Sequence, residues 1–235
     1  MVLRFVWSLS IGLVLMTSYA LPAFAEEFEY DGRKKCSSCH KSQYLSWKKT
    51  GHGHALKLLE AGERTEAKVK AGLKPDKDYT EDKACIGCHV TGWGSEGGYD
   101  IDDPSKYLVN VTCESCHGPG ADYRLIHRKG GERFERKKQT TARMELAKLG
   151  EDFEFQERCN RCHLNYEGSP WPGAKKPYTP FTPKVDPKYA FDFEKAVRNE
   201  KAMHTHFKLE GTFTGPPLPA FHSEFQATAK PINPE

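Results

Sequence analysis

The sequence predicts a mainly α-helical single domain with long loops and little β structure, whose core is supplied largely by bound groups. Three observations support this. Hydrophobic residues make up only 37% of the 235-residue chain, which leaves a thin core for its length. Helical periodicity occurs in segments 42–71, 141–158 and 190–209. The cysteines all occur in one short motif that is repeated along the chain.

Residues 1–25 have the features of a cleaved secretory signal. A basic start with Arg4 precedes an apolar run over residues 5–16 and the small-residue pattern Ala23-Phe24-Ala25. The apolar run is shorter than the roughly 20 residues that span a bilayer. We expect cleavage after Ala25 and a mature domain of residues 26–235, without a transmembrane segment and outside the cytoplasm. An uncleaved N-terminal anchor is the alternative.

Two segments between the periodic ones are predicted to be loops. The glycine-rich stretch WGSEGGYDIDDP (93–104) favours a loop or short hairpin. Segment 167–188 contains too many prolines for a helix, and it is either a lid over a bound group or a surface connector. The net charge is only +3, and no dense basic run alternates with aromatic residues, so nucleic acid is not expected as a partner.

The cysteine motif decides the chemistry. All 8 cysteines occur in four C-x-x-C pairs, and each pair is followed directly by histidine. The four motifs are Cys36, Cys39 and His40; Cys85, Cys88 and His89; Cys113, Cys116 and His117; and Cys159, Cys162 and His163. C-x-x-C-H is the attachment signature of c-type haem. Two thioethers hold two edges of one porphyrin, and the adjacent histidine is the proximal ligand of the iron.

Disulfides or zinc sites would also use paired cysteines, but neither requires a histidine after every pair. With 10 histidines in the chain, four chance successes have odds of order a few in a million. The sequence therefore predicts four covalently bound haem c groups and leaves no cysteine for a disulfide or a catalytic thiol. Because the haems replace much of the core, the apoprotein is predicted to be largely unfolded.

The sixth position of each iron needs a separate ligand. The remaining candidates are His52, His54, His127, His204, His206 and His222, together with Met144 and Met203. In a helix over 190–209, His204 would lie within about 20° of Val197 on the apolar face. His206 would lie about 200° from His204, so we expect His204 to be a ligand and His206 to be solvated or to support it.

The other histidines are less constrained by pattern. His52 is slightly favoured over His54, because it shares a face with Leu45, Leu56 and Leu59. His127 follows a Leu-Ile step and precedes a Gly-Gly pair that predicts a helix stop. His222 follows a proline-rich loop.

Several stretches resemble the tetrahaem cytochromes c-554 of ammonia-oxidising bacteria. They are GRKKCSSCHKSQ, CESCHGPG, ERCNRCHLNYEGSPW, PYTPFTP and KAMHTHFKLEG, and the similarity extends over essentially the whole mature chain. The resemblance implies a mostly helical, periplasmic multihaem cytochrome with closely packed pairs of haems, and we expect a monomer. It also implies hydroxylamine oxidoreductase as electron donor and a membrane-bound tetrahaem quinone-reducing cytochrome as acceptor.

The resemblance further implies distal ligands for three haems. His127 would oppose His40 on the first haem, His52 would oppose His117 on the third, and His204 would oppose His163 on the fourth. The second haem would be five-coordinate on His89, with Thr179, Pro180 and Phe181 closing its other side. The related protein has lysine where this chain has His54, so His54, like His222, stays open as a sixth ligand of that haem.

Two functions are consistent with these features. The first is an electron carrier, since closely packed haems form a short path for electrons. The alternative is an enzyme that reduces nitric oxide or another small nitrogen oxide at the five-coordinate haem. Arg124, Arg128 and Lys129 lie near the third motif, but they can equally bind propionates or a partner. A structural or binding module has no support beyond the fold.

Overall fold

The computed structural model describes residues 28–232, so the expected signal at residues 1–25 lies outside the described part. The helices in this part are mostly short. They are α1 (Arg33–Ser37), α2 (Lys41–Trp47), α3 (Thr65–Lys70), α4 (Cys113–His117), α5 (Tyr123–Lys137), α6 (Arg143–Ala147), α7 (Phe155–His163), α8 (Phe193–Ala196) and α9 (His222–Thr228). Four 3-10 turns accompany them: η1 (His52–His54), η2 (Leu56–Leu59), η3 (Ile86–Cys88) and η4 (Pro187–Tyr189).

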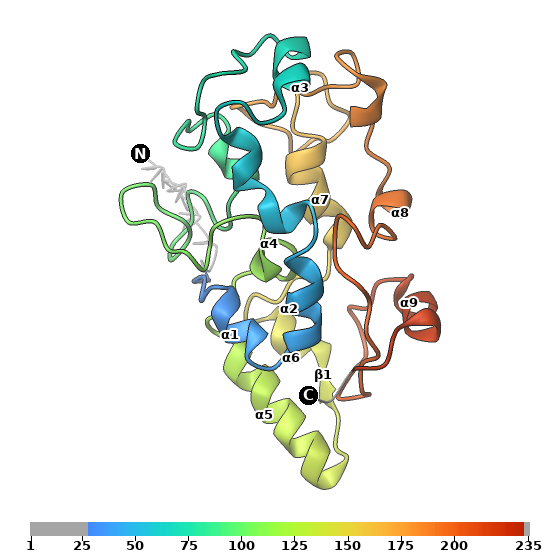
Figure 1. The fold of residues 1–235 in the computed structure, drawn as a ribbon. Helices are drawn as coiled ribbons and strands as arrows, with labels where there is room; N and C mark the ends of the chain where they lie inside the picture. The colour runs from blue at the N-terminus through green and yellow to red at the C-terminus, as the bar shows by residue number, and fades with distance from the viewer. Residues whose placement is uncertain (1–27, 233–235) are drawn as a thin grey trace, which may run out of the picture.

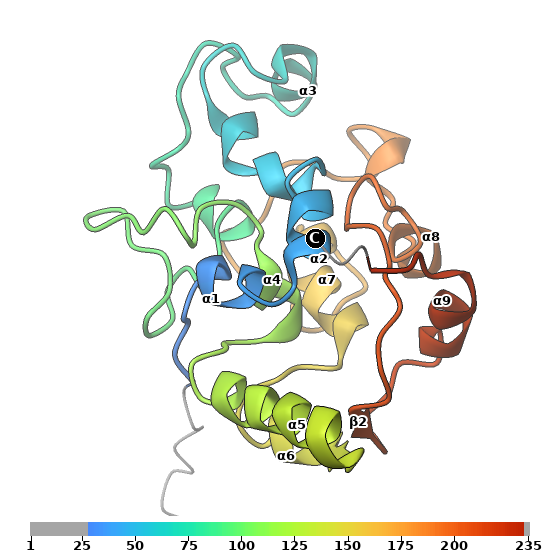
Figure 2. The same cartoon turned by 60° about the horizontal axis from the view of Figure 1, so that its bottom comes forward.

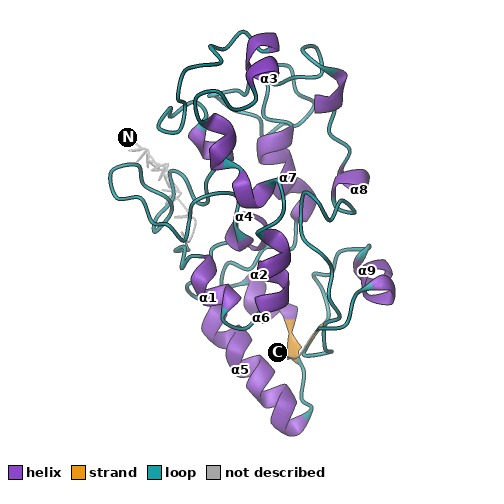
Figure 3. Ribbon diagram, viewed as in Figure 1, coloured by secondary structure: helices purple, strands orange, loops and turns teal. Residues whose placement is uncertain are grey.

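Within residues 28–232, strand structure is limited to two parallel strands of two residues each, β1 (Thr141–Ala142) and β2 (Phe213–Thr214). Figure 3 shows that loops connect most of the helices. The predicted mainly α-helical fold with long loops and little β structure is therefore confirmed. No helix of residues 28–232 is long and apolar enough to cross a membrane.

The three predicted helical segments are each broken. In 42–71, α2 ends at Trp47 and the chain turns sharply, since a Cβ atom at Gly53 would lie 2.5 Å from the Trp47 carbonyl oxygen. Segment 141–158 divides into β1, α6 and the start of α7. In 190–209 the Asp192 side chain caps α8 as expected, but α8 ends at Ala196. Beyond it, the Lys201 backbone N–H donates to the Asn199 side-chain oxygen. This local hydrogen bond takes the place of one that a continuing helix would make.

The longest helix, α5, was not predicted. Gly130 and Gly131, which predicted a stop, lie inside it. Gly130 is buried, and a Cβ atom there would come within 2.7 Å of the Phe213 ring in β2. Glycine is therefore needed at this position because an aromatic ring from a distant strand lies against the helix.

The elements are arranged around the motif-bearing helices. In Figure 1, α5 lies at the bottom, α3 and its loops lie at the top, and α9 lies at the right-hand edge. Between them lie α1, α2, α4, α6 and α7, and α4 packs against α7. Figure 2 shows α1 and α9 on opposite sides in a second view. A small hydrophobic cluster of Ile86, Val90, Tyr99 and Leu108 surrounds the second motif.

Candidate functional site

Each C-x-x-C-H motif forms about one turn of helix. The third motif is α4 itself, the fourth ends α7, and the second forms η3. In the first, the His40 backbone N–H donates to the Cys36 carbonyl at 3.0 Å, the bond of a helical turn. Side chains at i, i+3 and i+4 share one face of a helix. Each motif therefore presents two sulfur atoms and one imidazole to the same side, as a haem c group requires.

The motifs contact one another in two pairs. The thiols of Cys36 and Cys113 lie close enough to shift each other's pKa, which places the first motif beside the third. The thiols of Cys88 and Cys162 do the same, which places the second motif beside the fourth. In haem c these sulfur atoms would be thioethers on porphyrin edges, so these contacts place two edges side by side.

A buried carboxylate holds the first pair together. The side chain of Glu114, inside the third motif, is fully buried and accepts three backbone hydrogen bonds. The donors are the N–H groups of Asp31, Gly32 and Gly120 at 2.7–2.8 Å. The first two lie just before α1, so Glu114 fixes the start of the first motif against the third. Sequence reasoning missed this role.

Two pairs of histidine rings have the spacing of ligands on opposite sides of one iron. A metal–imidazole bond of about 2 Å, plus about 1 Å from the nitrogen to the ring centre, gives roughly 6 Å between centres. The rings of His40 and His127 are 5.7 Å apart, and those of His52 and His163 are 6.0 Å apart. These residues therefore fit a haem iron held by two histidines.

The second pair differs from the pairing that the resemblance implied. His52 lies beside His163 of the fourth motif, whereas the resemblance led us to place it opposite His117. His204 interacts electrostatically with His117 and with His40, which puts it with the first and third motifs. The segment that carries His52 lies against the segment that carries His204. Which haem each histidine serves therefore depends on how these two segments pack. The Thr205 N–H donates to Ser46 Oγ at 2.6 Å, and the Gly51 N–H donates to the Lys201 carbonyl at 3.0 Å.

Desolvation favours the neutral form of these imidazoles, which is the form that binds iron, and this includes His163, whose side chain is partly open to solvent. Desolvation lowers the pKa values of His40, His52 and His89, and it lowers those of His117, His127 and His163 to about 4. Backbone carbonyls orient two of the rings. Nδ1 of His89 lies 2.5 Å from the Ala55 oxygen, and Nδ1 of His204 lies 2.8 Å from the Thr205 oxygen. Nε2 of each ring is then available to a metal.

The remaining histidines have other surroundings. His54 is exposed, and its Nδ1 lies 3.0 Å from the Thr50 carbonyl oxygen. His222 is half-buried at the start of α9, and its pKa is lowered by burial and by Arg143. His206, expected to be either solvated or a supporting neighbour of His204, is half-buried and stacks on Phe225 of α9 with ring centres 4.0 Å apart. Because residues 197–206 are not helical, the rings of His204 and His206 are only 5.4 Å apart.

The methionines differ in exposure. Met144 is 44% exposed, which is unfavourable for an axial ligand, whereas Met203 is half-buried.

The expected cap is tied to the end of the fourth motif. Thr179, Pro180 and Phe181 are half-buried, and the Thr179 N–H donates to the Asn165 carbonyl at 2.9 Å. The Asn165 side chain donates to the Pro177 carbonyl and accepts from the Lys175 N–H, both at 2.9 Å. Asn165 follows His163 by two residues, so it anchors the proline-rich stretch to α7. The position of this stretch over the second haem remains a prediction.

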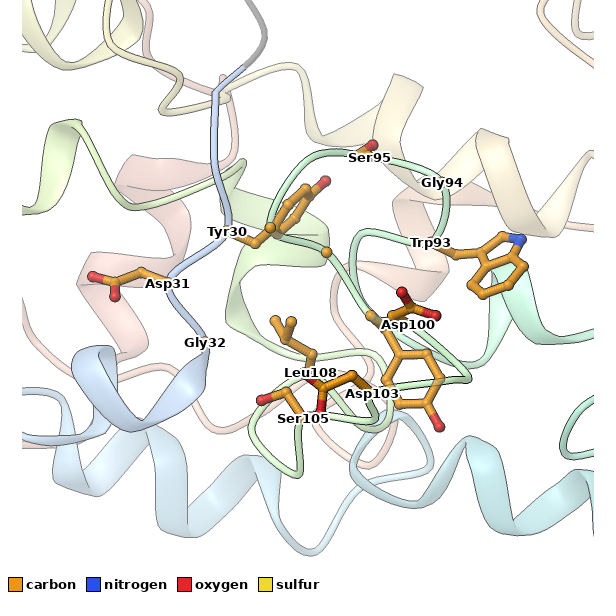
Figure 4. A pocket seen from close by; sticks show the side chains of 13 residues that line it. Tyr30, Asp31, Gly32, Trp93, Gly94, Ser95, Asp100, Asp103, Ser105 and Leu108 are labelled. Atoms are coloured by element: carbon orange, nitrogen blue, oxygen red, sulfur yellow. The ribbon is translucent and has the colours of Figure 1, made fainter.

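One cavity lies apart from the motifs. It has a volume of about 610 Å³ and lies between residues 30–32 and the glycine-rich loop after the second motif. Figure 4 shows Tyr30, Trp93, Asp100 and Asp103 around it. Its lining contains no cysteine or histidine of the motifs, so it is not one of the haem positions.

The competing uses of paired cysteines have no geometric support in residues 28–232. None of the eight cysteines is in a disulfide. No group of three or more His, Cys, Asp or Glu side chains in this range could hold one metal ion, as a structural zinc would require.

Comparisons with known proteins agree with the motif geometry. The family model described as cytochrome c554 and c-prime matches residues 35–118. Cytochrome c-554 of Nitrosomonas europaea is 55% identical over 226 residues, which cover 95% of this chain and 96% of that protein. The solved structure of reduced cytochrome c554 from Nitrosomonas europaea superimposes with a TM-score of 0.86 at 58% identity, over 87% of this chain and 99% of its own. The protein is thus a multihaem electron carrier with covalently bound haem c, and the chain belongs to the cytochrome c-554 family.

Proposed function

We propose that the mature chain binds four haem c groups, one at each motif, and carries electrons in the periplasm from hydroxylamine oxidoreductase. The acceptor is a membrane-bound tetrahaem cytochrome that reduces the quinone pool. The protein acts as a monomer after loss of residues 1–25. Each bound haem c supplies one-electron chemistry by changing between its ferric and ferrous forms.

The paired motifs are the observation that carries this proposal. Cys36 contacts Cys113, and Cys88 contacts Cys162, so the four sites form two adjacent pairs. Electrostatic interaction between Cys116 and Cys159 places the third and fourth motifs near each other and links the pairs. The order first, third, fourth, second therefore gives a continuous series of neighbouring sites through the molecule.

Ring spacing supports two of the distal ligands in this proposal, and the electrostatic interaction of His204 with His117 supports the third. His127 opposes His40 on the first haem, His204 opposes His117 on the third, and His52 opposes His163 on the fourth. The carbonyl contacts described above fix two of the imidazoles before iron binds, and burial excludes water from them. Ligands fixed in this way limit the structural change that accompanies electron transfer.

The second haem has His89 as its only protein ligand in this proposal. The proposal gives no ligand role to His54, which is exposed and has its Nδ1 3.0 Å from the Thr50 carbonyl oxygen, or to His222, which lies at the start of α9. Thr179, Pro180 and Phe181 restrict access to its open side. Their attachment to Asn165 would hold them there as a fixed cover.

Electron paramagnetic resonance of the oxidised holoprotein tests the ligand count. We expect three low-spin haems and one high-spin haem. Four low-spin haems would require a sixth ligand on the second haem and would reject the assignment.

The carrier role is tested by mixing the oxidised holoprotein with hydroxylamine. Haem reduction is expected only when hydroxylamine oxidoreductase is present. Equally fast reduction without that enzyme would contradict a carrier role. Rapid turnover of nitric oxide by the reduced protein alone would favour the enzymatic alternative.

A further inference from the structure

We infer that an acidic redox protein docks on the surface beside the first motif. This haem-1 surface consists of Lys34, Lys35 and Lys106. Lys34 and Lys106 lie around Tyr107, and Lys34 and Lys35 belong to α1, the helix that carries Cys36 of the first motif. The inference rests on the proposed electron-carrier function and adds the place of contact and the charge of the partner.

The first motif carries the most exposed cysteine of the four motifs. Cys39 is exposed, whereas the other seven cysteines of the motifs are half-buried. It lies in the turn between α1 and α2, where Ser38 is exposed as well. An electron transferred between proteins must cross from one cofactor edge to another, so the most exposed attachment point favours exchange here.

Cations gather around Tyr107 at this place. The Lys34 and Lys106 ammonium groups lie 5.4 and 5.3 Å from the centre of its ring, and the Arg33 guanidinium lies 5.9 Å away. Lys34, Lys35 and Lys106 are exposed, and no acidic side chain of residues 28–232 forms an ion pair with them. Like charges this close repel one another, and an acidic partner would relieve that repulsion.

The two segments that form the surface are held rigidly together. The Arg33 N–H donates to the Tyr107 carbonyl at 3.2 Å. Gly32, at φ +81°, leaves no room for a side chain, because a Cβ atom there would lie 2.9 Å from Tyr107 Cβ. Arg33 is further fixed by the Val109 carbonyl at 3.3 Å. A fixed aromatic residue surrounded by cations has the composition of a binding hot spot.

Carboxylates line the cavity that adjoins this surface at Gly32. Gly32 also lines the cavity of Figure 4, whose walls include Asp100 and Asp103. Asp31, on the same side, is paired with Arg124. Carboxylates next to the cationic surface would repel an acidic partner that docks in the wrong orientation.

The occupant is a protein rather than a membrane. Polybasic segments that bind anionic bilayers contain about 4–8 basic residues, whereas this surface exposes three lysines beside a half-buried ring. A bilayer also offers nothing to exchange electrons with the haem at Cys39. An acidic protein surface with its own cofactor satisfies both features.

The test compares two triple variants of the holoprotein with the same change in net charge. The first is Lys34→Gln, Lys35→Gln and Lys106→Gln. The control is Lys175→Gln, Lys184→Gln and Lys208→Gln, which are also exposed but lie in segments away from α1. Association of oxidised protein with immobilised hydroxylamine oxidoreductase is measured at about 0.01 M and 0.15 M salt, where the Debye length is roughly 30 and 8 Å.

The first triple variant is expected to associate about tenfold more slowly at low salt and to show a weaker salt dependence. The control is expected to stay within about twofold of the wild type. Equal losses in both variants would overturn the inference, because the effect would then reflect net charge alone. So would binding to anionic phospholipid vesicles that is lost in the first variant while binding to the oxidoreductase is retained.

Electron transfer with small redox ions tests the haem-1 surface independently of the proposed electron donor. Oxidation of the reduced protein by anionic ferricyanide is expected to slow in the first triple variant, and oxidation by cationic tris(phenanthroline)cobalt(III) is expected to quicken. Unchanged rates with both ions would overturn the inference. If the wild type neither binds nor is reduced by the oxidoreductase, the proposed donor is wrong, while the two ions still report whether electrons are exchanged at the haem-1 surface.

Discussion

Replacement of Glu114 by alanine should lower the melting temperature of the holoprotein by about 8–16 °C. The change leaves three buried backbone N–H groups without an acceptor: those of Asp31, Gly32 and Gly120. Each unsatisfied donor costs about 1–3 kcal/mol. Relief of the buried charge offsets part of this, since desolvation raises the pKa of Glu114 despite those bonds. We therefore expect the free energy of unfolding to fall by about 4 kcal/mol. Each kcal/mol lowers the melting temperature by about 2–4 °C in a domain of this size.

The matched variants make this test specific to the buried hydrogen bonds. Glu114→Gln keeps the oxygen shared by the Asp31 and Gly120 donors and loses one bond, so a shift of about 4–8 °C is expected. Glu157→Ala removes an exposed i,i+4 pair with Arg161, worth about 0.5 kcal/mol or less. Calorimetry at pH 7 measures all three. The reasoning fails if Glu114→Ala shifts the melting temperature no more than Glu157→Ala does.

Three further outcomes are expected. His52→Gly should convert one low-spin haem to high spin in the resonance spectrum, with recovery on adding imidazole, whereas His54→Gln should leave the spectrum unchanged. Phe181→Ala should speed carbon monoxide binding to the reduced second haem, and an unchanged flash-photolysis rate would argue against the cap. Burial raises the pKa of Glu151 to about 7, opposed by Arg143, from 4.5 when unfolded. The folded state then holds the extra proton, so stability should fall by about 3 kcal/mol as pH rises from 5 to 8. Thermal melts of Glu151→Gln should lack this component, and an identical pH dependence would contradict it.

The local features of the site were accessible from the sequence. Each motif spans five residues, so its helical turn and its shared face follow from spacing alone. The preference for His52 over His54 agrees with the exposure of His54. For His204 the reasoning was wrong in its geometry, because the helix on which the argument depended ends at Ala196.

The distant contacts were not accessible in the same way. An acidic residue inside CESCH is visible in the sequence, but its hydrogen-bond donors at Asp31 and Gly32 lie 83 and 82 residues away. Gly130 resembles a helix stop until Phe213 is known to lie against it. The partner of His52 likewise depends on how segments 46–52 and 201–205 meet. Such pairings are set by tertiary packing, on which local pattern gives no information.

The contacts between motifs also constrain how the protein is assembled. The first motif pairs with the third and the second pairs with the fourth, so the pairs interleave along the chain. No single cut can separate the molecule into two halves that each keep a complete pair. During synthesis and export, the first pair lacks a member until Cys113 emerges, and the second waits for Cys162. Attachment at the early motifs must therefore act on an open chain, and the protein is expected to become compact only after its last haem is in place.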